Sequence, residues 1–363
     1  MDRSGPLNRI LRQAGRALQV QQAGLLAVIL VLGTVLTLFA GSHQDPLTGL
    51  TVNNFLNANT LLQTATDASF FAIMAVGATM VIISGGIDLS VGSVFALAGV
   101  TMGLVLRTWQ PENGLLAILA GLALSVGMGV LCGLVNGCLM VGLRVHPFII
   151  TLGTMWIFRG IAFVASRAES ILVPDALTDS VKASLGLGGQ LAPIPLLAMV
   201  AVAALGSVFL SRTVLGRHIF AVGGNAEASR YAGLSLGRVY ISVFAVAGLT
   251  AGIAAYLGGA FYGSTSCADA TGYELYVIAS AVVGGASLQG GKGSVISAML
   301  GALLITLIRQ SIRTLHLDQN YEWIIIGCAI IVAVVLDRAS AVVAEKRLTR
   351  IAPDTVSPEE GTP

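Results

Sequence analysis

Charged side chains are scarce in this sequence: Asp, Glu, Lys and Arg make up 10% of its 363 residues, against roughly 25% in soluble proteins. Aromatic residues are also few, at 6%, whereas hydrophobic residues reach 55% and glycine occupies 44 positions. This composition excludes a soluble globular protein and indicates a polytopic membrane protein. The glycines favour close helix contacts, because lipid gives apolar helices no hydrophobic reason to associate. A net charge of +2 provides no argument for a nucleic-acid partner.

Cysteine and histidine are equally sparse, with four of each, and neither forms a recognisable site. Cysteine lies in apolar runs at Cys132, Cys138 and Cys328 and in a polar loop at Cys267, without metal or disulfide spacing. Histidine is scattered over His43, His146, His218 and His316, and no catalytic triad or paired carboxylates emerge. The sequence therefore predicts no metal site and no enzyme.

Long apolar runs are what the chain does have. About 20 helical residues cross the roughly 30 Å of hydrocarbon in a bilayer. Such runs occur at 24–41, 61–83, 88–107, 115–141, 147–166, 193–211, 239–262, 274–289, 293–314 and 322–337. We predict an all-α membrane protein, a helical bundle of about ten transmembrane helices, in which the eighth run is short and the third and ninth begin at glycine-rich breaks.

The chain divides into a short N-terminal segment (1–23), one membrane domain (24–338) and a C-terminal tail (339–363) expected to be largely disordered. Arginines before the first apolar run resemble the start of a signal peptide, but no cleavage pattern follows, so we favour a retained first span. Basic residues gather at both termini and in the 212–238 loop, and acidic ones in the loops of the other side. Because basic loops stay in the cytosol, we expect both termini there.

The longest polar interruption is Leu215–Arg238, between two apolar runs. Asn225 is expected to cap a short helix that starts at Ala226, with Glu227 near the positive end of the helix dipole. We interpret the 212–238 loop as presenting this helix to a cytosolic partner.

Two glycine-rich breaks interrupt apolar runs, at 84–93 and 284–294. The hinge candidates are the glycine pairs Gly85, Gly86, Gly284, Gly285, Gly290 and Gly291. In the first break, Asp88 either caps the following helix or lines the solute route, since a carboxylate within lipid is costly. The second break resembles a phosphate-binding loop, but Ala286 and Gly293 occupy positions where that motif needs glycine and a hydroxyl. The chain itself is therefore not expected to hydrolyse ATP.

Polar side chains within the predicted spans either join helices or line a path for a polyhydroxylated solute. They are Asn136, Thr151, Thr154, Arg159, Ser280 and Thr306. Arg159 stands out because a guanidinium inside a span needs a carboxylate or water. Tyr273 and Glu274 open the eighth span, either as path residues or as an interfacial anchor and an N-terminal helix charge. Our candidates for the path or gate are Asp88, Ser90, Asn136, Thr151, Arg159, Tyr273 and Glu274.

Four segments resemble the permease subunits of ribose-type ABC importers, which carry monosaccharides and related small polar solutes. They are SGGIDLSVGS (84–93), HPFIITLGT (146–154), GRHIFAVGGNAEASRYAGL (216–234) and TGYELYVIASAVVGGASLQGGKGS (271–294). The similarity extends over roughly 55–340, with the motifs in the order and spacing of that family. One departure is Tyr276, where ribose-type relatives more often carry an acidic residue, so ribose itself stays an open choice of solute.

The resemblance implies a type II ABC importer permease fold in a bacterial inner membrane, with both termini in the cytosol. It implies as partners an ATPase subunit that holds ATP and Mg, an extracytoplasmic sugar-binding protein and a second permease copy or paralogue, and no cofactor on this chain. It also assigns contact with the ATPase to the cytosolic loop, at Gly216, Arg217, Gly223, Gly224, Asn225, Glu227, Ala228, Arg230 and Gly233. A transporter driven by an ion gradient is the alternative; it predicts several buried carboxylates, and Asp67 and Asp88 are the only acidic candidates in or beside spans before residue 270.

Overall fold

The computed structural model of this chain describes residues 6–44, 49–185, 192–328, 331–332 and 335. The helices are α1 (Pro6–Phe39), α2 (Ala58–Ile83), α3 (Val91–Trp109), α4 (Gly114–Leu143), α5 (Pro147–Ser166), α6 (Asp175–Val181), α7 (Ile194–Arg212), α8 (Val214–Gly224), α9 (Ala226–Tyr231), α10 (Leu236–Tyr262), α11 (Tyr273–Val283) and α12 (Val295–Thr314). The strands are β1 (Ser42–Gln44), β2 (Thr51–Asn53), β3 (Ile171–Leu172) and β4 (Ser264–Thr265). The all-α prediction is confirmed.

Within the described residues, eight helices are long and apolar enough to cross a membrane: α1 (from Gln22), α2, α3, α4, α5, α7, α10 and α12. Their bounds agree with eight of the ten predicted runs to within about three residues. The predicted span at 274–289 is wrong in length, because α11 ends at Val283 after 11 residues, about 16 Å of helix. The predicted span at 322–337 is helical over 321–328 but lies partly outside the described residues, and the 339–363 tail lies wholly outside them.

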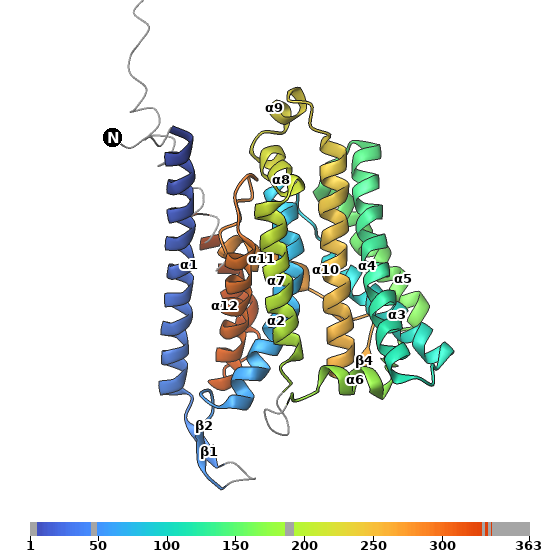
Figure 1. Ribbon diagram of the computed structural model, residues 1–363. Helices are drawn as coiled ribbons and strands as arrows, with labels where there is room; N and C mark the ends of the chain where they lie inside the picture. Colours follow the sequence, from blue (N-terminus) through green and yellow to red (C-terminus); the bar gives the residue numbers. More distant parts are fainter. Residues whose placement is uncertain (1–5, 45–48, 186–191, 329–330, 333–334, 336–363) are drawn as a thin grey trace, which may run out of the picture.

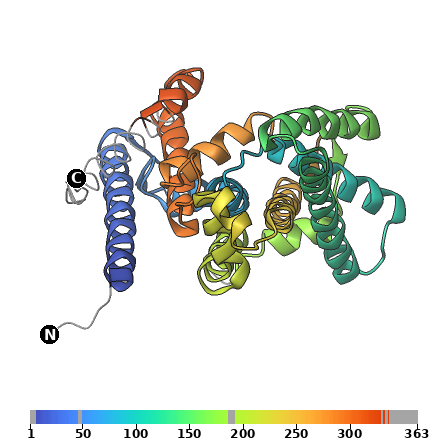
Figure 2. The same ribbon diagram turned by 90° about the horizontal axis from the view of Figure 1, so that it is seen from above.

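Helix α2 forms the centre of the bundle. Nearly all of its apolar window is buried, and it packs against α7, α10, α11 and α12 (Figure 2). The outer helices α4, α5 and α7 bury less than a third of their apolar windows, and their exposed residues are large and apolar. Large apolar side chains on the outside suit a bundle whose outer surface meets lipid.

Glycines bring α4 and α10 into backbone contact. Gly129 on α4 faces Gly248 on α10 so closely that a side chain on either would overlap the carbonyl oxygen of the other. Gly133 repeats this approach one turn later, against Phe244. Small residues of this kind let helices pack tightly in lipid, as expected from the glycine content.

The two ends of the bundle differ (Figure 1). Helices α8 and α9 lie at the end where α1 begins, and the β1–β2 hairpin and α6 lie at the opposite end. Strands β3 and β4 pair antiparallel and tie the segment after α5 to the segment after α10. Short strands in these loops were not predicted from the sequence.

Candidate translocation path and coupling region

The predicted coupling loop contains two helices where we expected one. Thr213 caps α8 by accepting a hydrogen bond from the Gly216 N–H at 3.0 Å. Asn225 then caps α9, accepting from the Ala228 N–H at 2.8 Å, which confirms the predicted cap. Gly223 and Gly224, directly before this cap, form the last turn of α8. Together α8 and α9 form a bent arm that projects from the bundle (Figure 1).

The projecting part of this arm is α9, whose only buried residue is Ser229. Glu227, Ala228 and Arg230 are exposed, and the chain turns away after the helix at Gly233, which has a φ of +82°. Tyr231 is 85% exposed, which is unusual for an aromatic ring, and the site prediction did not include it. Exposed aromatic and arginine side chains are the residues that most often anchor protein interfaces.

The inner end of the arm is held by glycine. A Cβ atom on Gly223 would overlap the carbonyl oxygen of Ile83, the last residue of α2, and would lie 2.7 Å from the Gly291 nitrogen. Gly290 and Gly291 in turn lie against the backbone of Gly223 and Gly224, and the Gly291 N–H donates to Ile83 O at 2.8 Å. The end of α8 therefore contacts both predicted breaks, backbone against backbone.

The two breaks begin with the same backbone turn. Gly85 and Gly285 follow α2 and α11 with φ of +88° and +89°, a conformation that glycine adopts at little cost. At each break the N–H of this glycine donates to the carbonyl three residues earlier, and the N–H of the following residue donates to the carbonyl five residues before it. The other predicted hinge glycines are Gly86, beside Val81; Gly284, which caps α11 against α12; and Gly290 and Gly291, both with positive φ. Their hinge role stays a prediction.

Asp88 does not cap α3 as expected. The residue at the N-cap position is Ser90, and Asp88 Oδ1 accepts from the Ser90 N–H at 2.8 Å and from Ser90 Oγ at 2.7 Å. Asn136 on α4 donates to Ser90 Oγ at 2.8 Å, while its own Oδ1 is buried without a hydrogen-bond partner among the described residues. The carboxylate therefore shapes the break and links it to α4.

Replacing Asp88 by asparagine is expected to keep at least half of the wild-type uptake, because an amide oxygen can accept the same two hydrogen bonds. Replacing it by leucine should destabilise the protein by about 1–3 kcal/mol, because the buried N–H and hydroxyl of Ser90 lose their acceptor. Uptake and thermal unfolding in detergent measure the two effects. A large loss of uptake in Asp88→Asn with unchanged unfolding would instead assign a role to the charge.

The start of α5 holds the same break from the other side. Thr151 Oγ1 donates to Ile87 O and accepts from the Leu89 N–H, both at 3.1 Å. The other three hydroxyl candidates, Thr154, Ser280 and Thr306, bond to carbonyls four residues earlier in their own helices. Thr151 thus joins helix to loop, and a path role for any of these hydroxyls stays a prediction.

The hydrogen bonds of Arg159 on α5 go to loop carbonyls, and the carboxylates of Asp269 and Glu274 lie close enough to interact with its charge. Its Nη1 donates to the carbonyl oxygens of Cys267 and Asp269, both at 2.6 Å. These carbonyls belong to the loop between α10 and α11, whose Asp269 accepts from the Ser266 N–H at 2.8 Å. Arg159 therefore satisfies loop backbone that no helix pairs, which is the condition for irregular backbone at membrane depth.

Tyr273 and Glu274 begin α11, as predicted, although this helix is too short to span. Glu274 lies against the start of α3: a Cβ atom on Gly92 would be 2.6 Å from Glu274 Oε2. Tyr273 packs on Phe71 of α2 with ring centroids 4.5 Å apart. Among the seven candidates for the path or gate, hydrogen bonds join Asp88, Ser90 and Asn136 into one group, and Tyr273 and Glu274 lie outside it.

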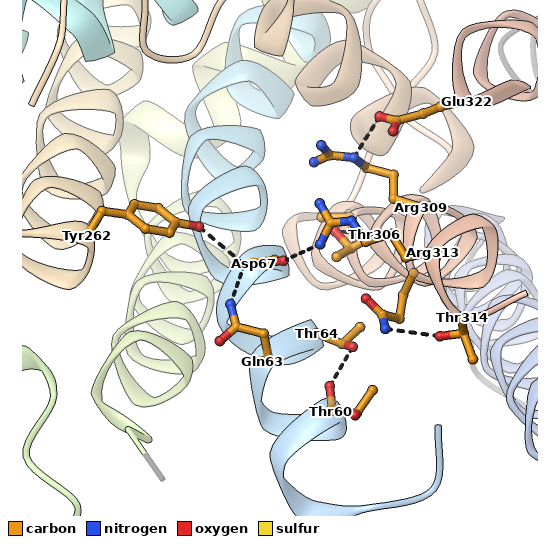
Figure 3. Close-up of polar contacts among 12 residues, drawn as sticks. Thr60, Gln63, Thr64, Asp67, Tyr262, Thr306, Arg309, Arg313, Thr314 and Glu322 are labelled. Atoms are coloured by element: carbon orange, nitrogen blue, oxygen red, sulfur yellow. Dashed lines mark hydrogen bonds and ion pairs between the residues drawn. The ribbon is translucent and has the colours of Figure 1, made fainter. Parts of the chain in front are cut away.

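A second polar cluster, made of Asp67, Arg309, Arg313 and Glu322, lies towards the end of the bundle opposite α8 and α9, and of these four residues only Asp67 had been considered (Figure 3). Asp67 of α2 pairs with Arg313 of α12 at 3.2 Å. Arg309 of α12 lies 2.7 Å from Glu322 of the last described helical segment. No sequence signal pointed to this cluster, because its members lie far apart in the chain.

A projecting arm joined to two helix breaks, in a bundle with an apolar outer surface, defines a multi-pass membrane permease. Residues 60–334 match the model of the branched-chain amino acid transport system / permease component family, and the chain belongs to this family of transport permeases. These proteins are transport subunits and not enzymes.

Three relatives align with this chain over most of their length. The D-allose transport system permease protein of Escherichia coli is 36% identical over 287 residues, 78% of this chain and 85% of the relative. The ribose import permease protein of Escherichia coli is 33% identical over 323 residues, 89% and 95% of the two chains. The autoinducer 2 import system permease protein of Yersinia pseudotuberculosis is 32% identical over 295 residues, 79% and 85%. The predicted resemblance to sugar importer permeases is confirmed.

Proposed function

We propose that this chain is the membrane subunit of an ATP-driven importer that carries a monosaccharide or a similar small polar solute across a bacterial inner membrane. The names of the relatives support this solute class, since they denote import of D-allose, ribose and autoinducer 2. In this proposal a separate ATPase subunit holds ATP and Mg, an extracytoplasmic binding protein delivers the solute, and a second permease copy or paralogue completes the path. Both termini then lie in the cytosol.

The observation that carries the proposal is the arm formed by α8 and α9. Its exposed face includes Arg217, Glu227, Arg230 and Tyr231, and its inner end contacts both breaks through Gly223. A partner that moves α9 and α8 therefore acts on the end of α2 and on the loop between α11 and α12 without any intervening side chain. Closure of an ATPase on ATP is a suitable source of such motion, and it shifts the bundle between inward-open and outward-open states.

The alternative, a transporter driven by an ion gradient, finds less support. Coupling ions need a carboxylate that is free to bind them. Asp67 is occupied, since it pairs with Arg313 and accepts from Gln63 and Tyr262. Asp88 is engaged in the turn at Ser90.

The test is Arg230→Glu, which reverses a charge on the exposed face of α9. We expect the variant to reach the membrane but to lose most of its co-purification with the partner ATPase, and uptake to fall at least about tenfold, because like charges oppose at the interface. Arg167→Glu is the matched control: it reverses an exposed arginine directly after α5, at the end of the bundle where β3 pairs with β4. Equal co-purification of both variants would refute the docking role of α9.

A further inference from the structure

We propose that the cluster in Figure 3 is a binding site for an uncharged, polyhydroxylated solute on the permease itself, at the end opposite α8 and α9. This inference rests on the proposed function and deepens it, because it assigns solute contact to named residues of this chain. Its core consists of Asp67, Arg309, Arg313 and Glu322, carried by α2, α12 and the segment 321–328.

The geometry supplies many hydrogen-bonding groups in a small region. Asp67 Oδ1 accepts from Gln63 at 2.9 Å and from the Tyr262 hydroxyl at 3.3 Å, while its Oδ2 faces Arg313. Glu322 Oε1 accepts from the Tyr276 hydroxyl at 2.6 Å. These side chains come from α2, α10, α11, α12 and the 321–328 segment, and Figure 3 shows Asp67 facing Arg313 and Glu322 facing Arg309.

The charges of the core cancel. Two arginines face two carboxylates, and no other charged side chain contacts them among the residues that the structure describes. An anionic solute would require excess positive charge, and a cationic one would require excess negative charge. A balanced set of donors and acceptors suits a neutral solute with several hydroxyl groups.

Aromatic rings border the same side chains. The Arg309 guanidinium lies 5.2 Å from the Phe71 ring centre and 5.0 Å from that of Tyr276. Trp323 lies beside Tyr276 with ring centroids 6.1 Å apart, and it is 58% exposed. Rings of this kind offer apolar faces to the C–H groups of a solute, while the polar groups fix its orientation.

A purely structural role explains the cluster less well. The Arg313 side chain is 44% exposed, and an ion pair with this much access to solvent contributes only about 0–1 kcal/mol to stability. Arg309 Nε is buried and lies close to Glu322, yet it makes no hydrogen bond with suitable geometry among the described residues. The exposed Arg313 side chain therefore has N–H groups that a bound solute can use, whereas the buried Nε of Arg309 faces Glu322.

The experiment measures sugar binding to the purified full-length chain in lipid nanodiscs by changes in tryptophan fluorescence. The probes are D-ribose and D-allose, with D-gluconate as the anionic and D-glucosamine as the cationic comparison. We expect saturable binding of at least one neutral sugar and at least about tenfold weaker binding of both charged ones. Absence of binding by every neutral sugar, or equal binding of the charged ones, overturns the proposal.

Two variants test the residues. Arg313→Gln and Asp67→Asn should each weaken binding of the neutral sugar about tenfold, since each removes charge-assisted hydrogen bonds. Arg107→Gln makes the same change at an exposed position on α3 and should leave binding unchanged. Wild-type affinity in both cluster variants contradicts the assignment.

A charge exchange separates binding from helix stapling. The double variant Asp67→Arg with Arg313→Asp restores an ion pair, so we expect wild-type thermal unfolding but no recovery of sugar affinity. Recovery of both would show that the cluster only holds the helices together. ATP-driven uptake by the assembled transporter separates the two proposals. Normal uptake with no binding at this cluster refutes the site alone. Binding at this cluster in a chain that co-purifies with no ATPase and takes up no sugar with ATP refutes the importer alone.

Discussion

Replacing Gly223 by alanine is expected to lower ATP-driven uptake at least about tenfold while the protein still reaches the membrane. A methyl group at this position overlaps the carbonyl oxygen of Ile83 and crowds the Gly291 nitrogen, so α8 must move away from both breaks. Forcing extra volume into a packed contact costs about 1–3 kcal/mol, and here the obstacle is backbone that cannot change rotamer. Uptake into vesicles and membrane yield measure the effect.

The neighbouring glycine provides the control. A Cβ atom on Gly224 meets nothing within 4 Å, and both residues belong to the last turn of α8. Any general effect of alanine on helix propensity is thus common to the two variants. Uptake in Gly224→Ala should stay within about twofold of wild type, and equal losses in both would show that contact with α2 is not what matters.

The second large effect is expected for Arg159→Met. This variant keeps much of the side-chain volume but removes both hydrogen bonds to the loop between α10 and α11, leaving the carbonyls of Cys267 and Asp269 without this partner. Each buried group left unpaired costs about 1–3 kcal/mol, so the loop should loosen and uptake should fall about ten- to a hundredfold. Arg159→Lys should be intermediate, since an ammonium keeps the charge without the planar fork.

Thiol labelling detects the loop directly. Cys267 is 1% exposed, so it should react with maleimide much faster in Arg159→Met than in the parent protein. Serine at Cys138 and Cys328 removes the exposed thiols in both. Arg167→Met, at the exposed end of α5, is the control. Slow labelling in Arg159→Met, at the rate of that control, would contradict the proposal that Arg159 holds this loop in place.

Hydrophobic runs predicted the spanning helices well, because length and apolarity are local properties of the chain. They failed at α11, because the apolar run was extended through residues 284–289 into the glycine-rich break. The helix ends there because Gly285 takes a positive φ and the chain turns back towards Gly223. Close approach of another backbone leaves no pattern in the sequence other than the glycine itself.

The candidate site was predictable only where its chemistry is local. The cap at Asn225 lies three residues from its donor and was found. Arg159 reaches carbonyls more than 100 positions away, and Asp67 pairs with Arg313 across 246 positions. A single sequence shows that these groups need partners but does not say which ones. The second polar cluster was therefore found only from the fold.

The glycine contact at the base of the arm also bears on how such transporters diversify. At Gly223 the last turn of α8 has no space for a side chain, so contact with the bundle fixes this residue whichever ATPase is bound. Helix α9 buries only Ser229, and its other positions are free to vary. Exchange of α9 alone between related transporters should therefore change which ATPase binds, while the contact of Gly223 with the bundle is retained.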